Sequence, residues 1–139
     1  MGIINLSSSL DKTNNLNKNN SIDNINNFNI SLKTPIHTLN YHKDYILCLS
    51  ILNDGRLISG SYDNSIIIYN KTTYQPDLII NEHKSIVRCI IQLSSGIVAT
   101  CSLDKTIKLF NIEGNNYNII QTLNDHTSDV YKIIEIENK

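Results

Sequence analysis

Three kinds of side chain that could do chemistry together recur along this 139-residue chain: a histidine, a serine or threonine, and an aspartate. The two sets, 41 residues apart, are His42, Ser59 and Asp63, and His83, Thr100 and Asp104. A hydroxyl, an imidazole and a carboxylate are the groups of a hydrolase triad, in which the imidazole activates the hydroxyl as a nucleophile. A catalytic triad occurs once, whereas this set recurs with a fixed period. The repetition therefore favours a structural role over catalysis, and no G-x-S-x-G, H-E-x-x-H or phosphate-loop motif accompanies it.

The histidines and aspartates belong to a longer internal repeat. The stretch "ISGSYDNSIIIYN" at residues 58–70 returns as "ATCSLDKTIKLFN" at residues 99–111. Gly55 and Gly96 are also 41 residues apart, whereas His83 and His126 are separated by 43, with the two extra residues in "NIEGNNYN". A period of about 40–45 residues is that of a β-propeller blade.

The elements that must position these side chains are predicted to be short strands. Apolar, β-branched runs such as "YILCLSIL" and "IVRCIIQL" are separated by "NDG", "YDN", "SSG" and "LDK". This spacing leaves no room for a helix of ordinary length and predicts an all-β fold of four-stranded antiparallel meanders.

At these residues the chain resembles the WD-repeat β-propeller family, whose blades carry a histidine before the first strand and then a pattern like "SGSxDxTIxLWD". "SGSYDNSIIIYN" and "TCSLDKTIKLFN" match it. The resemblance implies a buried network in which the turn aspartate accepts from the histidine, the histidine bonds a hydroxyl, and the hydroxyl bonds a third-strand tryptophan. Carried over, its members are His42, Ser59 or Ser61, Asp63 and Tyr69, then His83, Thr100 or Ser102, Asp104 and Phe110, and finally His126.

The chain departs from the family pattern at the aromatic position. It has no tryptophan, and the "WD" dipeptide has become "YN" and "FN". Tyr69 still carries a hydroxyl, but Phe110 cannot donate a hydrogen bond. We therefore expect the second network to stop at its hydroxyl, and the aspartate–histidine pairs to be kept.

The resemblance also implies a partner-binding face, formed by the loop before the first strand and the turn between the second and third strands. Aromatic residues and arginine, which dominate protein-interface hot spots, are frequent at the transferred positions. An alternative is that the aliphatic members fill gaps between blades. The positions are Tyr45, Leu47, Tyr62, Ile86, Arg88, Leu103, Asp129 and Tyr131.

Composition narrows the functional classes. The net charge of −1 gives no basic footprint for nucleic acid, and no apolar run is long enough for a membrane span. Cys48, Cys89 and Cys101 form no metal-binding spacing and favour a reducing compartment, the cytoplasm or the nucleus. Neither a metal nor a cofactor is expected.

Domain organisation follows from the change in composition near Pro35. Residues 1–34 contain ten asparagines and five serines, and we expect them to be a disordered tail. Residues 35–139 are expected to form a partial propeller, with an outer strand at 35–40, blades at 41–81 and 82–124, and the start of a third blade at 125–139.

Two blades cannot close a propeller, which needs four to eight. The chain is therefore expected to be a fragment of a longer propeller, a subunit that self-associates to complete a ring, or a small open pair of sheets. The function expected is a non-catalytic scaffold that binds proteins or peptides. The alternatives are a substrate receptor in a ubiquitin-ligase or signalling complex, or a truncated product without independent activity.

Overall fold

The computed structural model describes residues 4–6 and 37–136. The chain divides into two compact units, one of residues 39–139 with 1–4, the other of residues 5–38. Every regular element in the described residues is a strand, and the two four-stranded sheets are antiparallel, which confirms the predicted all-β fold. In the described part of the chain there is no helix long and apolar enough to cross a membrane.

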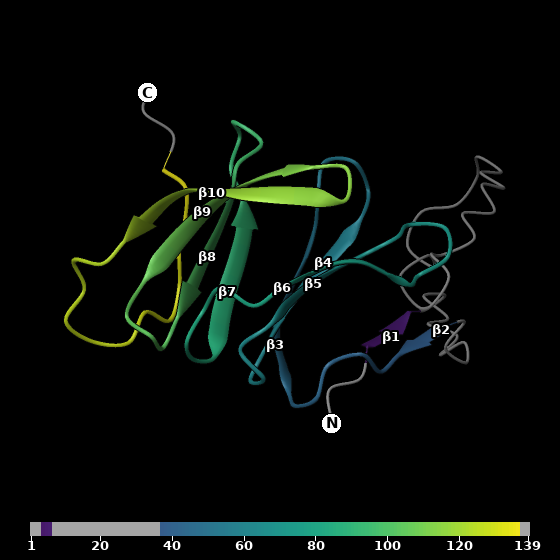
Figure 1. Cartoon of the computed structure of the whole chain (residues 1–139), viewed down its shortest axis with the longest axis horizontal. Coiled ribbons are helices and arrows are strands. Elements are labelled where there is room, and N and C mark those ends of the chain that lie inside the picture. Colours follow the sequence, from purple (N-terminus) through teal and green to yellow (C-terminus); the bar gives the residue numbers. More distant parts are fainter. Residues whose placement is uncertain (1–3, 7–36, 137–139) are drawn as a thin grey trace, which may run out of the picture. The chain divides into compact units, whose positions relative to one another are not determined.

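The first four-stranded sheet is a meander in which consecutive strands are neighbours (Figure 1), in the order β3-β4-β5-β6. It lies within the first predicted blade. Its strands are β3 (Ile46–Ile51), β4 (Leu57–Ser61), β5 (Ile66–Tyr69) and β6 (Pro76–Ile80).

The second four-stranded sheet repeats this meander within the second predicted blade, in the order β10-β9-β8-β7. Its last two strands are longer than their counterparts because the two inserted residues extend the hairpin, where Glu113 pairs with Asn116. Gly114 in this hairpin turn has a φ of 57°. The strands are β7 (Val87–Gln92), β8 (Val98–Ser102), β9 (Ile107–Glu113) and β10 (Asn116–Leu123).

The turns of the two sheets have matching backbone conformations. Gly55 and Gly96, between first and second strands, have φ values of 88° and 89°, a region that glycine enters without steric cost. Asn64 and Lys105 follow the turn aspartates and have φ values of 70° and 71°. The left-handed conformation is more favourable for asparagine than for lysine, so the surrounding structure must hold Lys105 in this conformation.

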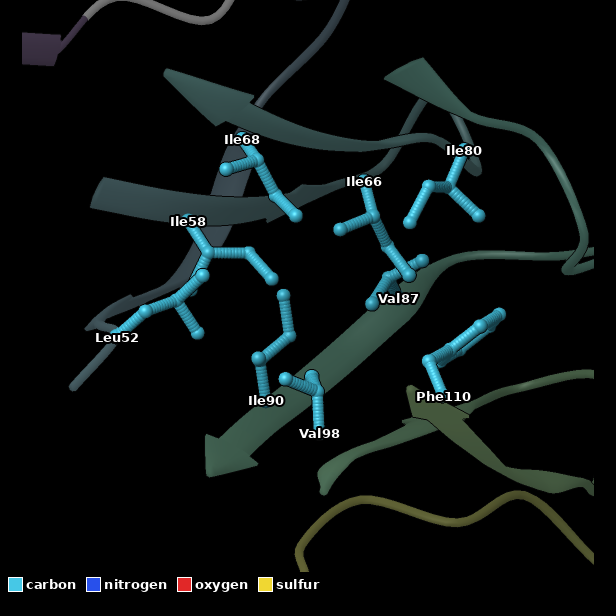
Figure 2. Packing of buried hydrophobic residues seen from close by; sticks show 9 residues of the cluster. All are labelled: Leu52, Ile58, Ile66, Ile68, Ile80, Val87, Ile90, Val98 and Phe110. Atoms are coloured by element: carbon cyan, nitrogen blue, oxygen red, sulfur yellow. The ribbon is translucent and has the colours of Figure 1, made fainter. Parts of the chain in front are cut away.

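The hydrophobic core lies between the two sheets. Figure 2 shows side chains of β4, β5 and β6 pointing toward those of the second sheet. Gly60 leaves room for close packing of β4 against β7, because a Cβ atom there would lie 2.6 Å from Val87 Cγ1 and 2.7 Å from Cys48 Sγ. The buried cluster consists of Leu52, Ile58, Ile66, Ile68, Ile80, Val87, Ile90, Val98 and Phe110.

A buried arginine ties the inserted hairpin to the first sheet. Arg56 is 7% exposed and donates from Nη1 to the carbonyl oxygen of Gly114 at 2.6 Å. Its Nε donates to Asp54 Oδ2 at 2.7 Å, and Asp77 Oδ2 lies 4.0 Å from Nη1. The insertion therefore forms an inter-sheet contact.

Within the predicted N-terminal tail, the structure describes one short strand. β1 (Ile4–Leu6) pairs with β2 (His37–Leu39) in a two-stranded sheet, and β2 falls within the outer strand predicted at 35–40. Ile4 is 5% exposed and is therefore buried. The remainder of the predicted tail lies outside the described residues.

Residues 124–136, which lie at the predicted start of a third blade, contain no strand. This segment does not pair with any described strand. One backbone hydrogen bond joins it to β8, from Val130 N–H to the Ser102 carbonyl at 3.2 Å. Its contacts nevertheless repeat those of β7. Ser94 N–H donates to Glu135 Oε2 at 2.9 Å, as Asn53 N–H donates to Gln92 Oε1 at 2.7 Å.

Candidate functional site

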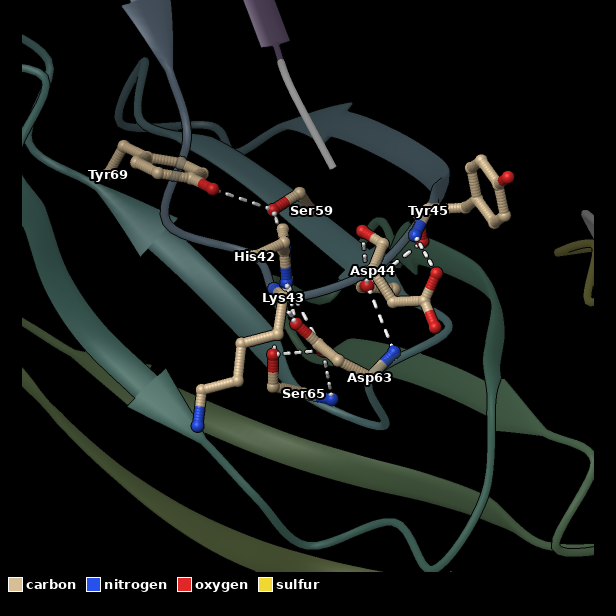
Figure 3. A network of polar contacts seen from close by, with 9 residues as sticks. His42, Lys43, Asp44, Tyr45, Ser59, Asp63, Ser65 and Tyr69 are labelled. Atoms are coloured by element: carbon tan, nitrogen blue, oxygen red, sulfur yellow. Dashed lines mark hydrogen bonds and ion pairs between the residues drawn. The ribbon is translucent and has the colours of Figure 1, made fainter. Parts of the chain in front are cut away.

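The first blade brings together the histidine, the hydroxyl, the carboxylate and the tyrosine (Figure 3). His42 Nδ1 lies 3.0 Å from Asp63 Oδ2, and His42 Nε2 lies 2.7 Å from Ser59 Oγ. Ser59 Oγ lies 3.2 Å from the hydroxyl of Tyr69. Since a carboxylate only accepts, a neutral imidazole donates from Nδ1 to Asp63 and accepts the Ser59 hydroxyl proton at Nε2.

Local structure explains why these groups meet. His42 precedes β3, Ser59 lies on β4, and Asp63 occupies the turn between β4 and β5. The other candidate hydroxyl, Ser61, holds the turn instead: its Oγ donates to the Tyr45 carbonyl at 2.9 Å and accepts from Asp63 N–H at 3.1 Å. Ser59 is therefore the member that touches the histidine.

Two further residues that donate to the turn carboxylate, Ser65 and Lys43, were not predicted as site residues. The Ser65 hydroxyl donates to Asp63 Oδ1 at 2.5 Å, and the Lys43 backbone N–H donates to Asp63 Oδ2 at 2.7 Å. The sequence did carry a signal for Ser65, since a threonine, Thr106, stands at the same place in the second repeat.

The second blade repeats the arrangement as far as its hydroxyl. His83 Nδ1 lies 2.9 Å from Asp104 Oδ2, and His83 Nε2 lies 2.8 Å from Thr100 Oγ1. The Thr106 hydroxyl donates to Asp104 Oδ1 at 2.6 Å. Ser102 Oγ donates to the Ser85 carbonyl at 3.0 Å, as Ser61 Oγ in the first blade donates to the equivalent carbonyl of Asp44 at 3.3 Å.

The two remaining predicted members of the network make no hydrogen bond in it. Phe110 is fully buried and packs edge-on against Tyr117, with ring centroids 6.0 Å apart. His126 is exposed, and none of the described residues after it supplies a turn aspartate. Only two of the three predicted histidine sites are therefore assembled in the described residues.

The electrostatics of the two sites are alike. Burial raises the pKa of Asp63, but hydrogen bonds from Ser65, Lys43 and His42 outweigh it and bring that pKa to about 2. Asp104 has a pKa of about 2 for the same reasons, with Thr106 and Lys84 as donors. Burial lowers the pKa of His42 and of His83, and the neighbouring carboxylates offset this only in part.

The distances resemble those of a hydrolase triad, but the surroundings suit a structural role. Ser59 and Thr100 have no exposed surface, so a substrate has no path to either hydroxyl. A half-buried carboxylate with several donors fastens the turn to the segment ahead of the first strand. Burial raises the pKa of the Cys48 and Cys101 thiols to about 12, and no group of residues that could hold a metal ion is present in 4–6 and 37–136.

The predicted partner-binding residues fall into a contact pair, a contact group of three and an apolar set. Tyr45 and Tyr62 are 67% and 48% exposed and meet edge to face, with centroids 6.4 Å apart. The guanidinium of Arg88 lies 5.3 Å from the ring centroid of Tyr131, which is 57% exposed and donates to Asp129 Oδ2 at 3.4 Å. Leu47, Ile86 and Leu103 are half-buried.

Comparisons with known proteins agree with the repeat. The family model described as WD domain, G-beta repeat, matches residues 33–70 and 74–111. Among solved structures, the crystal structure of the WD40 beta propeller domain of Doa1 is similar, with a TM-score of 0.58 and 27% sequence identity. The similarity covers 65% of this chain but only 30% of that chain. A comparison with curated proteins finds no match.

Proposed function

Because the chain belongs to the WD40-repeat family, we propose that it is a non-catalytic scaffold that presents one rigid face to protein or peptide partners. The repeats and the propeller-like fold support a protein-interaction scaffold in general. The choice of face and the absence of catalysis are the specific parts of the proposal.

One observation carries the choice of face: large aromatic side chains stand exposed on turns that are rigidly held. The Tyr62 backbone N–H donates to the Tyr45 carbonyl at 2.8 Å, and Ser61 donates to the same carbonyl. Figure 3 shows the Tyr45 ring pointing away from the buried network. Tyrosine supplies a large contact area with few rotatable bonds, so binding through held tyrosines costs little conformational entropy.

A selection from a displayed library of random linear peptides, with the full chain as bait, tests this proposal. We expect the selected peptides to lose affinity for the Tyr45→Ser and Tyr62→Ser variants. The matched control is Ile120→Ser, because Ile120 is an apolar residue of β10 with 47% exposure, close to that of Tyr62. Peptides that bind all three variants equally well would place the binding surface elsewhere.

A further inference from the structure

The two arginines of the chain have very different hydrogen-bond partners. Arg56 donates to a carboxylate and to a carbonyl oxygen. The Nε of Arg88, by contrast, is buried and makes no hydrogen bond, and no carboxylate in the described ranges forms an ion pair with Arg88. A buried donor left without an acceptor is uncommon in native proteins and calls for a physical explanation.

The fold itself does not require a guanidinium at this position. The equivalent residue of the first blade is Leu47, which is half-buried as Arg88 is. Arg88 is held in place by the Tyr131 ring, and Tyr131 in turn donates to Asp129. The cation is therefore positioned and partly dehydrated, but its charge is not neutralised by these neighbours.

We propose that Arg88 binds the carboxylate of an aspartate or glutamate side chain in a peptide partner, while the exposed tyrosines supply apolar contact. This inference rests on the proposed function, since it names the partner of the same face. A planar guanidinium matches a carboxylate with two parallel hydrogen bonds, which here must come from the two Nη groups because the buried Nε is closed to an outside partner. The pairing is stronger where water is partly excluded. The buried Nε shows that water is partly excluded from this guanidinium.

The test uses the peptides selected on the full chain. We expect an acidic residue to be enriched at one peptide position, and its replacement by glutamine or asparagine to weaken binding about tenfold or more. The same replacement should cost almost nothing when binding is measured on the Arg88→Gln variant. Lys132→Gln is the matched control, because it removes one positive charge from an exposed residue beside Tyr131.

The outcomes separate this inference from the proposed function. The carboxylate inference alone is overturned if the selected peptides depend on Tyr45 and Tyr62 but show no acidic enrichment. It is also overturned if replacing the acidic residue weakens binding equally on the unaltered chain and on the Arg88→Gln variant. Peptides indifferent to the tyrosines and to Arg88 overturn both. Tighter binding of a phosphoserine peptide than of its glutamate counterpart would replace the carboxylate by a phosphate. The peptide-side replacement is measured on the unaltered chain, so it does not depend on the folding of a variant.

Discussion

At the scale of single residues, the turn aspartate is the network member whose loss we expect to destabilise each blade most. Asp63→Ala leaves the imidazole Nδ1–H, the Ser65 hydroxyl and the Lys43 N–H without their acceptor. We expect the free energy of unfolding to fall by about 1–3 kcal/mol, the penalty for a stranded buried donor. Chemical denaturation followed by circular dichroism measures this loss.

The control for that experiment is Asp125→Ala, because Asp125 is exposed and precedes a histidine that is not assembled into a network. Surface substitutions of this kind usually change stability by less than about 0.5 kcal/mol. Equal effects of the two substitutions would contradict the role assigned to the turn carboxylate.

The aromatic end of the network is expected to matter less. Tyr69→Phe removes the hydroxyl that lies 3.2 Å from Ser59 Oγ, and so makes the first blade like the second, where Phe110 occupies this position. The Ser59 hydroxyl keeps its bond to His42, so we expect a loss of only about 0.5–1.5 kcal/mol. The same denaturation experiment should rank this variant between wild type and Asp63→Ala, and a reversed order would be inconsistent with the network.

The sequence predicted the histidine and aspartate members because their spacing repeats, but it could not choose among the hydroxyls. Ser59 and Ser61 lie on one short strand, and only the register of β4 against β3 decides which of them faces His42. Ser65 was visible as a repeated hydroxyl, yet its bond to Asp63 depends on the left-handed residue Asn64 between them. Turn geometry of this kind is set by the fold around it and cannot be read from residue types alone.

At the scale of the elements, the contact between β4 and β7 depends on the absence of a side chain. Gly60→Ala would place a methyl group 2.6 Å from Val87 Cγ1, closer than packed carbon atoms allow. The neighbouring side chains or the strands that carry them would have to shift, and overpacking of this kind costs about 1–3 kcal/mol. A thermal melt of the variant should show a clear drop in Tm, and an unchanged Tm would mean that the two sheets separate more easily than the core implies.

The inserted hairpin offers a second test of how the sheets are joined. Arg56→Met keeps the apolar part of the side chain but leaves the Gly114 carbonyl oxygen without its donor. We expect a loss of about 1–3 kcal/mol in unfolding free energy. Lys71→Met is the matched control, since exposed Lys71 donates to the Asp54 carbonyl at 3.2 Å near the same hairpin. A similar loss in both variants would argue against a special role for the buried arginine.

The strands themselves could be predicted because apolar runs alternate with turn residues twice over, with the same lengths. The long-range role of the insertion could not be predicted, because a hairpin that is longer by two residues does not indicate which distant residue it will contact. The same holds for residues 124–136: their apolar pattern matches β7, but a strand also needs a neighbouring strand to pair with. Pattern therefore predicts the elements better than it predicts their partners.

At the scale of the whole first unit, the face proposed for binding is a composite. Tyr45 and Tyr62 belong to the first blade, Arg88 to the second, and Tyr131 to the segment that follows it. The family resemblance supplied these positions, but the pairing of Arg88 with Tyr131 and the missing acceptor of Arg88 needed the folded arrangement. The stability of the face therefore depends on the networks that hold each turn.

Those networks should make the stability of the molecule depend on pH in a direction that can be worked out. Burial holds the pKa of His42 and of His83 below 6.5, so below that pH the unfolded chain binds protons that the folded chain resists. The unfolding free energy should therefore be level near neutral pH and fall as the pH drops below about 6.5. Each histidine can contribute a slope of at most about 1.4 kcal/mol per pH unit.

The carboxylates act in a lower window. Asp63 and Asp104 have a pKa of about 2 in the folded chain against 3.8 ordinarily, so their contribution is present above pH 3.8 and is lost as the pH falls toward 2. Urea denaturation at a series of pH values should thus show two successive declines on acidification. A stability that instead rose between neutral pH and pH 5 would mean that the folded chain prefers an imidazolium paired with aspartate, and that burial is the weaker influence on these histidines.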